Sequence, residues 1–121
     1  MHILLVAIIS IILSVAAQFL LKLGMSSVDI KQAVAQPLSL RLPWTVLTNK
    51  FVFSGFALYG LGAVVWLKVL STWDVSKAYP LVGLGFALTV LVGMVLGESV
   101  SALRVLGILL ICEGVWLVAN S

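Results

Sequence analysis

Glu113 is the one carboxylate inside a long apolar run of this sequence, six residues before the run ends at Ala119. If the run forms a membrane helix, the carboxyl group lies roughly 9 Å from the helix end, at about 1.5 Å per residue. An ionisable group inside a membrane costs at least about 2.5 kcal/mol, so it requires a partner or a function. Lys68 and Lys77, at the ends of two other apolar runs, are its natural partners. Two interpretations stay open: an ion pair or protonated carboxyl that only stabilises packing, and a group that binds a ligand or carries a proton.

Ser10, Ser14, Gln18 and Lys22 recur at every fourth residue of the first apolar run. On a helix this spacing stacks them along one face, with a slow drift around the axis. That face would carry hydrogen-bonding groups across the membrane. Such groups either line a cavity or hold neighbouring helices together, at about 1 to 2 kcal/mol per hydrogen bond. The spacing alone does not separate these two interpretations.

A proline and two glycines mark the start of the third apolar run. Tyr79 is followed by Pro80 and then by Gly83 and Gly85. A helix accepts a proline in its first turn, and the stretch that follows can kink or repack. We interpret this segment as a candidate hinge. Trp66 and Tyr59, on the second run, are interpreted first as lipid or core contacts.

The residue types needed for enzymatic chemistry do not form a pattern. The sequence has no nucleophile–base pair, metal-ligand cluster or phosphate-cradling glycine loop, and its only histidine, His2, stands at the terminus. Cys112, the only cysteine, lies inside an apolar run, which excludes an internal disulfide and a cysteine-based metal site. We therefore expect no catalytic residue, no metal and no cofactor.

The composition indicates which elements position these residues. Of the 121 residues, 63% are hydrophobic and 9% are charged, a balance that the water-facing surface of a small globular domain does not have. A hydrocarbon core of about 30 Å needs about 20 apolar residues per helix. The sequence predicts an all-α membrane protein, one domain over residues 1–121 with four transmembrane helices in a bundle. The expected helices span approximately residues 3–22, 51–71, 77–96 and 102–119.

Positive charge is spread along the chain and not gathered in a run. The net charge of +3 therefore favours contact with phosphate or lipid headgroups, and we expect no nucleic acid partner. The side of the membrane that holds both termini carries Lys68 and Lys77, and the other side carries Lys22, Lys31, Arg41, Lys50 and Arg104. By the positive-inside rule the termini face outward. Because several of these charges lie in one long connection, the count does not decide the orientation.

Two segments admit alternative interpretations. Residues 1–16 end in small residues, as a signal peptide would, yet no Lys or Arg precedes the apolar stretch and the pattern continues to Lys22, which favours a retained helix. Residues 25–50 are more polar and contain Pro37 and Pro43, so they do not form a straight spanning helix. Trp44 favours contact with the membrane interface. A flexible connection is the alternative.

Gly107 and Gly114 stand seven residues apart in the last apolar run. This spacing returns to nearly the same helix face after two turns. Small residues on one face let another membrane helix approach closely. Four thin helices hardly enclose a substrate path by themselves, so we expect a dimer or heteromeric assembly with these glycines at the interface.

Three segments are similar to the drug/metabolite transporter superfamily: residues 13–18 (LSVAAQ) with Lys22, residues 66–70 (WLKVL) and residues 75–81 (VSKAYPL). Within it, nearly the whole chain resembles the four-helix ArnE and ArnF type of flippase subunit, which moves undecaprenyl phosphate linked to 4-amino-4-deoxy-L-arabinose. The segment from Gly107 to Gly114 also resembles the helix-four dimer motif of the small multidrug resistance exporters. Those exporters use an essential glutamate on helix one, and aligned through Lys22 that position is Ser14 here. Their proton and drug antiport is therefore not carried over, and Glu113 does not restore it by motif.

The resemblance implies a multi-pass protein of the bacterial inner membrane that helps to move a polyprenyl phosphate-linked amino sugar, in support of lipid A and lipopolysaccharide modification. The implied partners are membrane lipid, the lipid-linked sugar phosphate and a similar four-helix subunit, as a homodimer or a heterodimer. By hypothesis, lysines neutralise the phosphodiester, hydroxyl and amide groups replace sugar hydration, and a carboxylate receives the ammonium. The candidate substrate-binding residues are Ser14, Gln18, Lys22, Trp66, Lys68, Lys77, Tyr79 and Glu113.

Two other functions stay open at this point. One is an exporter of cations or metabolites in which Glu113 is the proton-coupling acid, and it predicts cation uptake driven by a pH gradient. The other is a non-transporting subunit that assembles a larger membrane complex. It predicts co-purification with a partner and no flux by the chain alone.

Overall fold

The computed structural model describes residues 2–35 and 41–121, and the regular structure in these two ranges is helical. In chain order the elements are α1 (His2–Met25), α2 (Val28–Ala35), α3 (Arg41–Thr48), α4 (Lys50–Leu70), α5 (Val75–Ala78), the 3₁₀ helix η1 (Tyr79–Val82), α6 (Gly83–Val95) and α7 (Ala102–Ala119). Pro37, one of the two prolines in the long connection, lies outside the described residues.

Within residues 2–35 and 41–121, four stretches are long and apolar enough to cross a bilayer. They are α1 with 24 residues, α4 with 21, the continuous segment from α5 through α6 with 21, and α7 with 18. These lengths match the about 20 residues that a hydrocarbon core requires. The predicted all-α fold with four transmembrane helices is confirmed, and the chain is a multi-pass membrane protein. Relative to the expected ranges, α1 continues to Met25 and the third span starts earlier, at Val75.

Polar side chains determine where α4 and α7 begin. The Asn49 side-chain oxygen accepts hydrogen bonds from the backbone N–H groups of Phe51 at 2.9 Å and Val52 at 3.2 Å. The Ser101 hydroxyl oxygen accepts one from the N–H of Arg104 at 3.1 Å. The first amides of a helix have no partner within the helix, so such caps stabilise its start.

Pro80 divides the third span. Proline has no amide hydrogen to close a helical turn, and a 3₁₀ turn at Tyr79–Val82 separates α5 from α6. After α6 the chain turns at Gly97, whose φ of 90° favours glycine. The Glu98 N–H there donates to the Gly93 carbonyl oxygen at 2.9 Å. The helix geometry thus changes at Pro80, inside the segment interpreted as a candidate hinge, and the hinge itself stays a prediction.

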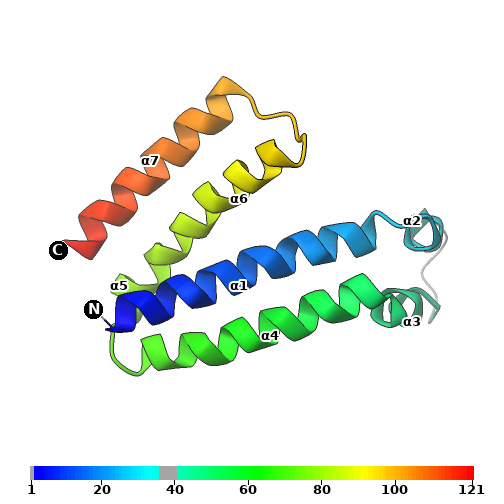
Figure 1. Ribbon diagram of the computed structural model, residues 1–121, viewed down its shortest axis with the longest axis horizontal. Coiled ribbons are helices and arrows are strands. Elements are labelled where there is room, and N and C mark those ends of the chain that lie inside the picture. Colours follow the sequence, from blue (N-terminus) through cyan, green and yellow to red (C-terminus); the bar gives the residue numbers. More distant parts are fainter. Residues whose placement is uncertain (1, 36–40) are drawn as a thin grey trace.

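The four spans form two antiparallel pairs. The helices α1 and α4 pack along their length, while α6 and α7 form a hairpin that diverges from the first pair (Figure 1). Contact between α6 and α1 is restricted to a short stretch, and α7 packs mainly on α6 and η1. Both termini and the turn between α4 and α5 lie at one end of the molecule, with α2 and α3 at the other (Figure 1).

Two small clusters of buried apolar residues join the pairs. One joins α1, η1 and α7 through Ile11, Val15, Leu81 and Val115. The other joins α1, α4 and α5 through Ala7, Val69 and Ala78. The core is therefore small and lies where the two hairpins meet.

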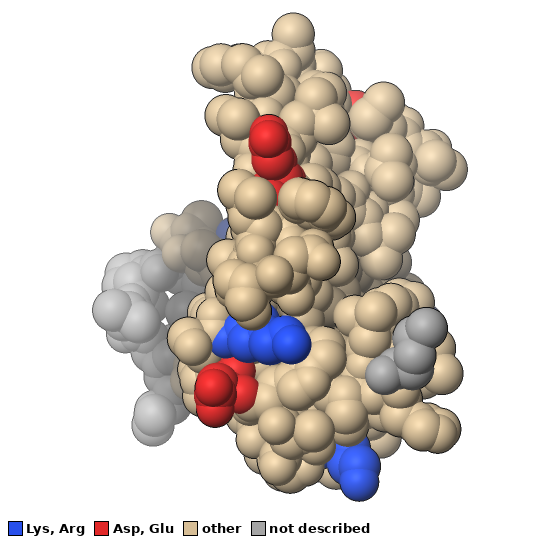
Figure 2. Space-filling view, turned by 90° about the vertical axis from the view of Figure 1, so that its left-hand side faces the viewer, with Lys and Arg blue, Asp and Glu red and all other residues tan. Residues whose placement is uncertain are grey.

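Much of the remaining apolar surface is exposed. Viewed from the end that holds the termini, the surface carries only scattered charged side chains (Figure 2). Large exposed apolar side chains occur on all four spans, for example Leu5, Phe53, Leu91 and Leu109. Lipid is the solvent that such a surface requires.

Candidate functional site

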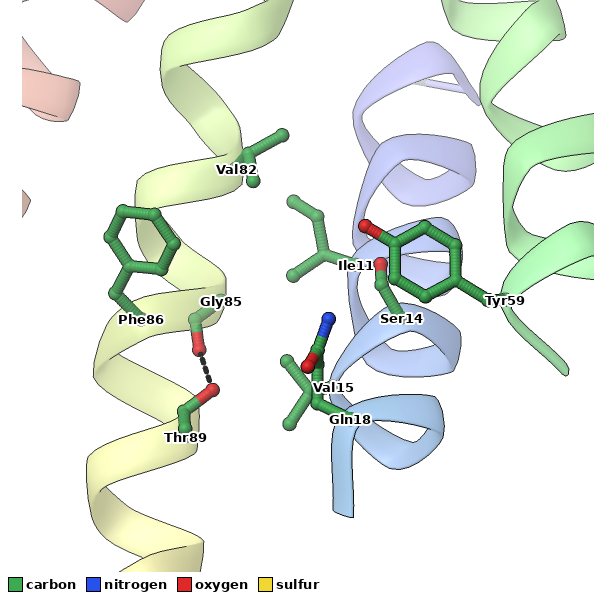
Figure 3. A pocket seen from close by; sticks show the side chains of 9 residues that line it. All are labelled: Ile11, Ser14, Val15, Gln18, Tyr59, Val82, Gly85, Phe86 and Thr89. Atoms are coloured by element: carbon green, nitrogen blue, oxygen red, sulfur yellow. Dashed lines mark hydrogen bonds between the residues drawn. The ribbon is translucent and has the colours of Figure 1, made fainter. Parts of the chain in front are cut away.

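Two adjoining cavities, which we call the central cavities, lie between α1, α4 and the third span. Their volumes are about 110 and 300 Å³. Both are lined by Ile11, Ser14, Tyr59 and Val82. The smaller is also lined by Val15, Gln18, Gly85, Phe86 and Thr89 (Figure 3). The larger is also lined by Ser10, Gly62, Ala63, Trp66, Leu67 and Tyr79.

The polar stripe of α1 divides into two parts. The buried Ser10 hydroxyl donates to the Gly62 carbonyl oxygen of α4 at 2.6 Å, which ties the two helices together. The Ser14 hydroxyl donates to the Ser10 carbonyl oxygen at 2.9 Å, so its own oxygen can still accept a hydrogen bond from a ligand. Gln18 lines the smaller cavity, whereas Lys22 lines neither. Both interpretations of the stripe therefore apply, each to different residues.

Aromatic side chains form the wall opposite α1. Trp66 and Tyr79, two of the candidate residues, line the larger cavity. Tyr59 lines both cavities, and Figure 3 shows its phenol directed toward α1. Tyr59, interpreted first as a lipid or core contact, therefore also lines the central cavities, and its side chain remains 43% exposed. Its spacing of seven residues from Trp66, with Gly62 between them, places all three on one helix face and is the signal that could have identified it.

The third span approaches α1 closely at Gly85. A Cβ at this position would lie 3.1 Å from Cγ2 of Ile11 and 3.4 Å from Cγ2 of Val15. One turn later the Thr89 hydroxyl donates to the Gly85 carbonyl oxygen at 2.7 Å (Figure 3). The Thr89 oxygen then remains an acceptor at the edge of the smaller cavity. Because Gly85 has no side chain, the third span lies close enough to α1 to form one wall of the smaller cavity.

The charged candidates lie outside the central cavities. Lys22 and Lys68 are exposed, and the Lys77 ammonium lies over the Trp73 ring, 4.7 Å from its centroid. Glu113 is exposed on α7, and none of the described residues forms an ion pair with it. The expected pair with Lys68 or Lys77 is therefore absent from the described chain.

The position of Glu113 on its helix explains this outcome. Val115 is the buried residue of α7 and faces the rest of the bundle. Glu113 precedes it by two residues, which is a rotation of about 200° around a helix. Its carboxylate is consequently on the side of α7 that faces away from the other spans.

The glycine face of α7 has open space beside it. A Cβ built at Gly107 or Gly114 would have nothing within 4 Å among the described residues. Only 6% of the residues in the α7 span are buried within the chain, against 28% of those in the α1 span. The room that another helix would need is present, and the dimer interface itself stays a prediction.

Comparison with known proteins relates nearly the whole chain to one group of transport proteins. The chain is 37% identical over 118 residues to the probable 4-amino-4-deoxy-L-arabinose-phosphoundecaprenol flippase subunit ArnF of Proteus mirabilis, over 94% of this chain and 89% of the relative. It is 33% identical over 113 residues to the probable ArnF subunit of Serratia proteamaculans, over 90% and 85% of the two chains. The chain belongs to the ArnE/ArnF family of flippase subunits.

Both kinds of ArnE/ArnF subunit are similar to this chain. The probable ArnE subunit of Pseudomonas savastanoi is 45% identical over 71 residues, which are 58% of this chain and 62% of that protein. No family model and no solved structure matches the chain. Membership of the ArnE/ArnF family confirms the resemblance inferred from the segments around Ser14, Trp66 and Lys77.

Proposed function

We propose that this chain is one subunit of a flippase that moves 4-amino-4-deoxy-L-arabinose linked to phosphoundecaprenol across the bacterial inner membrane, in support of lipid A modification. The observation that carries the proposal is the convergence of hydroxyl and amide groups from three spans on the central cavities. Polar groups at membrane depth are costly without partners, so such a convergence favours a polar passenger. The names of the ArnF relatives support this substrate.

The central cavities suit a sugar ring. Ser14, Gln18 and Tyr59 provide donors and acceptors that can replace water around sugar hydroxyls. Trp66 and Tyr79 add flat aromatic surface in the larger cavity. Volumes of about 110 and 300 Å³ lie at or below the lower end of the roughly 300–1,000 Å³ typical of ligand pockets. The larger cavity has the size of a sugar headgroup and is much smaller than a polyprenyl chain.

The negatively charged phosphate of the substrate requires a positively charged side chain next to the central cavities. The described residues that line them carry none. Lys77 lies in α5, two residues before Tyr79, which lines the larger cavity. We assign Lys77 to the phosphodiester at this boundary, where a charge-assisted hydrogen bond would anchor the headgroup. Release of its ammonium from the Trp73 ring would accompany that contact.

We assign transport to this site and not catalysis. The described lining residues include no carboxylate, imidazole or thiol, so their hydroxyls have no base that would activate them as nucleophiles. A flippase leaves the covalent structure of its substrate unchanged. Groups that replace water along the path are therefore sufficient for the proposed function.

A second four-helix subunit would complete the path at α7. Glu113 and the open face at Gly107 and Gly114 support this assembly, because a lipid-facing carboxylate costs about 2.5 to 3.5 kcal/mol near the centre of a membrane. A symmetric parallel homodimer through α7 would place two Glu113 carboxylates at one depth, where like charges repel. We therefore favour a heterodimer of ArnE-like and ArnF-like subunits. Glu113 would then face a cation of the partner or the ammonium of the amino sugar.

Transport by proteoliposomes tests the proposed path. The chain and its partner subunit are reconstituted together, and the movement of a fluorescent lipid-linked aminoarabinose between leaflets is followed. We expect Gln18→Leu to slow transport by about two- to tenfold, the equivalent of one hydrogen bond of about 0.5 to 1.5 kcal/mol. Gln32→Leu, the same exchange at an exposed position of α2, is the matched control and should match the parent.

Other outcomes would replace the proposal. Parental transport rates in correctly inserted Gln18→Leu and Tyr59→Phe variants would show that the central cavities are not the path. Cation uptake that requires both a pH gradient and Glu113 would identify an exporter. Stable co-purification with a partner but no flux in any combination would identify an assembly subunit.

A further inference from the structure

A third cavity, which we call the apolar groove, lies between α1 and α6. Its volume is about 490 Å³, and all the residues that line it are apolar. Six belong to α1, between Ile12 and Leu23, two belong to α6, Leu88 and Val92, and the last is Leu96, the C-cap residue of α6. Leu88 and Val92 are four residues apart and share one face of α6.

The groove exists because α6 approaches α1 at one point and then diverges. The close approach is at Gly85, where an added Cβ would lie 3.1 Å from Cγ2 of Ile11. Beyond that point the α6–α7 hairpin leans away from α1 toward its turn (Figure 1). The space between the two helices is therefore open at the level of Phe19 and Val92.

The apolar groove adjoins the smaller central cavity. Val15 lines both, and Gln18 of the cavity precedes Phe19 of the groove along α1. From Ile12 to Leu23 the groove follows α1 for about 16 Å, at about 1.5 Å per residue. That distance is roughly half of the about 30 Å hydrocarbon core, the depth of one leaflet. A compartment that carries hydrogen-bonding groups among apolar side chains thus meets, at the single side chain of Val15, an apolar groove of leaflet length.

Resting on the proposed function, we infer that the apolar groove binds the polyprenyl chain of the substrate while the central cavities hold its phosphosugar headgroup. The two compartments match the two ends of this amphiphile. Hydrogen-bonding groups line the first, and apolar side chains alone line the second. The first isoprene units, which are covalently attached to the phosphate, lie along α1 from Val15 toward Leu23.

The groove selects the chain by shape and packing. Bilayer lipid is as apolar as leucine, so moving a polyprenyl chain from lipid into the groove gains no hydrophobic energy. The gain comes from van der Waals contact with α1 and α6, which is small for each atom pair and adds along the chain. We therefore expect a preference of about three- to fivefold for a chain that fills the groove over one that does not.

A comparison of chain lengths tests this inference. Two fluorescent substrates carry the same aminoarabinose phosphate, one on a full undecaprenyl chain and one on a short geranyl chain. Transport of each is measured with the parent heteromer and with Ala16→Trp, which fills the groove. We expect the variant to slow transport of the long-chain substrate more than that of the short-chain substrate, so that the three- to fivefold preference is lost. Ala57→Trp, at an exposed position of α4, is the matched control and should keep the preference.

The outcomes separate the groove from the transport function. If Ala16→Trp moves both substrates and keeps the parental preference, the groove does not bind the chain, although the proposed function stands. If the parent moves neither substrate, the proposed function and the inference both fail. If Ala16→Trp does not insert, photo-crosslinking of the parent with a diazirine-labelled undecaprenyl substrate decides. Label on residues 12–23 that excess unlabelled substrate displaces supports the inference, and label that bulk phospholipid displaces equally well overturns it.

Discussion

The glycines at the α1–α4 contact and the glycines of α7 have opposite surroundings. In the first pair, a Cβ at Gly24 would lie 2.8 Å from the backbone nitrogen of Val52, and one at Gly55 would lie 2.8 Å from Cγ of Leu21. In α7, a Cβ at Gly107 or Gly114 would meet no described atom within 4 Å. Glycine therefore closes a contact inside the chain between α1 and α4, as Gly83 of α6 does against α7, and leaves a surface open along α7 itself.

Hydrogen bonding follows the same division. Ser10 of α1 donates to the Gly62 carbonyl oxygen of α4. In the described parts of α6 and α7, side-chain hydrogen bonds stay within one helix or its adjoining turn, as for Thr89 and Arg104. Lipid supplies no hydrophobic force between helices, so close packing and hydrogen bonds decide which helices associate. The comparison indicates one pair held together by contacts within the chain and one hairpin in which α7 has open surface.

The largest expected effect is on the contact between α1 and α4 at Gly24. Gly24→Ala places a methyl group against the backbone of Val52, and overpacking of this kind costs about 1 to 3 kcal/mol. We expect this loss in the free energy of unfolding of the detergent-purified chain, followed by circular dichroism during SDS titration. Gly114→Ala makes the same exchange in open space and should leave the stability unchanged or slightly higher. Equal losses in the two variants would remove the distinction between the regions.

An intermediate effect is expected on the open surface. Gly114→Leu should weaken association with the partner subunit about tenfold, or about 1.4 kcal/mol, because the side chain holds the second helix away. Association is measured by resonance energy transfer between labelled subunits in liposomes. Leu109→Trp adds bulk at an exposed position on another face of α7 and should associate like the parent. If both variants weaken association equally, the partner does not bind at the glycine face of α7.

The smallest expected effect concerns the serines of α1. Ser10→Ala removes the hydrogen bond to Gly62 and should lower the unfolding free energy by about 0.6 kcal/mol, the average for such bonds in a membrane protein. Ser14→Ala removes only a bond within α1 and should not change stability. The same SDS titration measures both. A larger loss for Ser14→Ala would mean that Ser14 and not Ser10 joins the two helices.

Four of the eight candidate substrate-binding residues named from the sequence line the central cavities. Ser14, Gln18, Trp66 and Tyr79 were expected to bind substrate, and the fold brings all four to the central cavities. Tyr59 was missed, since a tyrosine on a membrane helix is equally compatible with the lipid interface. The ion pair of Glu113 with Lys68 or Lys77, one of the two interpretations left open, is absent among the described residues, because depth in the membrane can be estimated from sequence but direction around the helix cannot.

Hydropathy and helix periodicity are local properties, and by themselves they determined the number of spans and the polar face of α1. The tertiary structure alone decided which faces meet. In water the apolar side of a helix reveals its core, but in lipid an apolar side chain is equally stable facing outward or inward. The angle between the two hairpins, which separates the central cavities from the apolar groove, follows from close contacts such as that at Gly85.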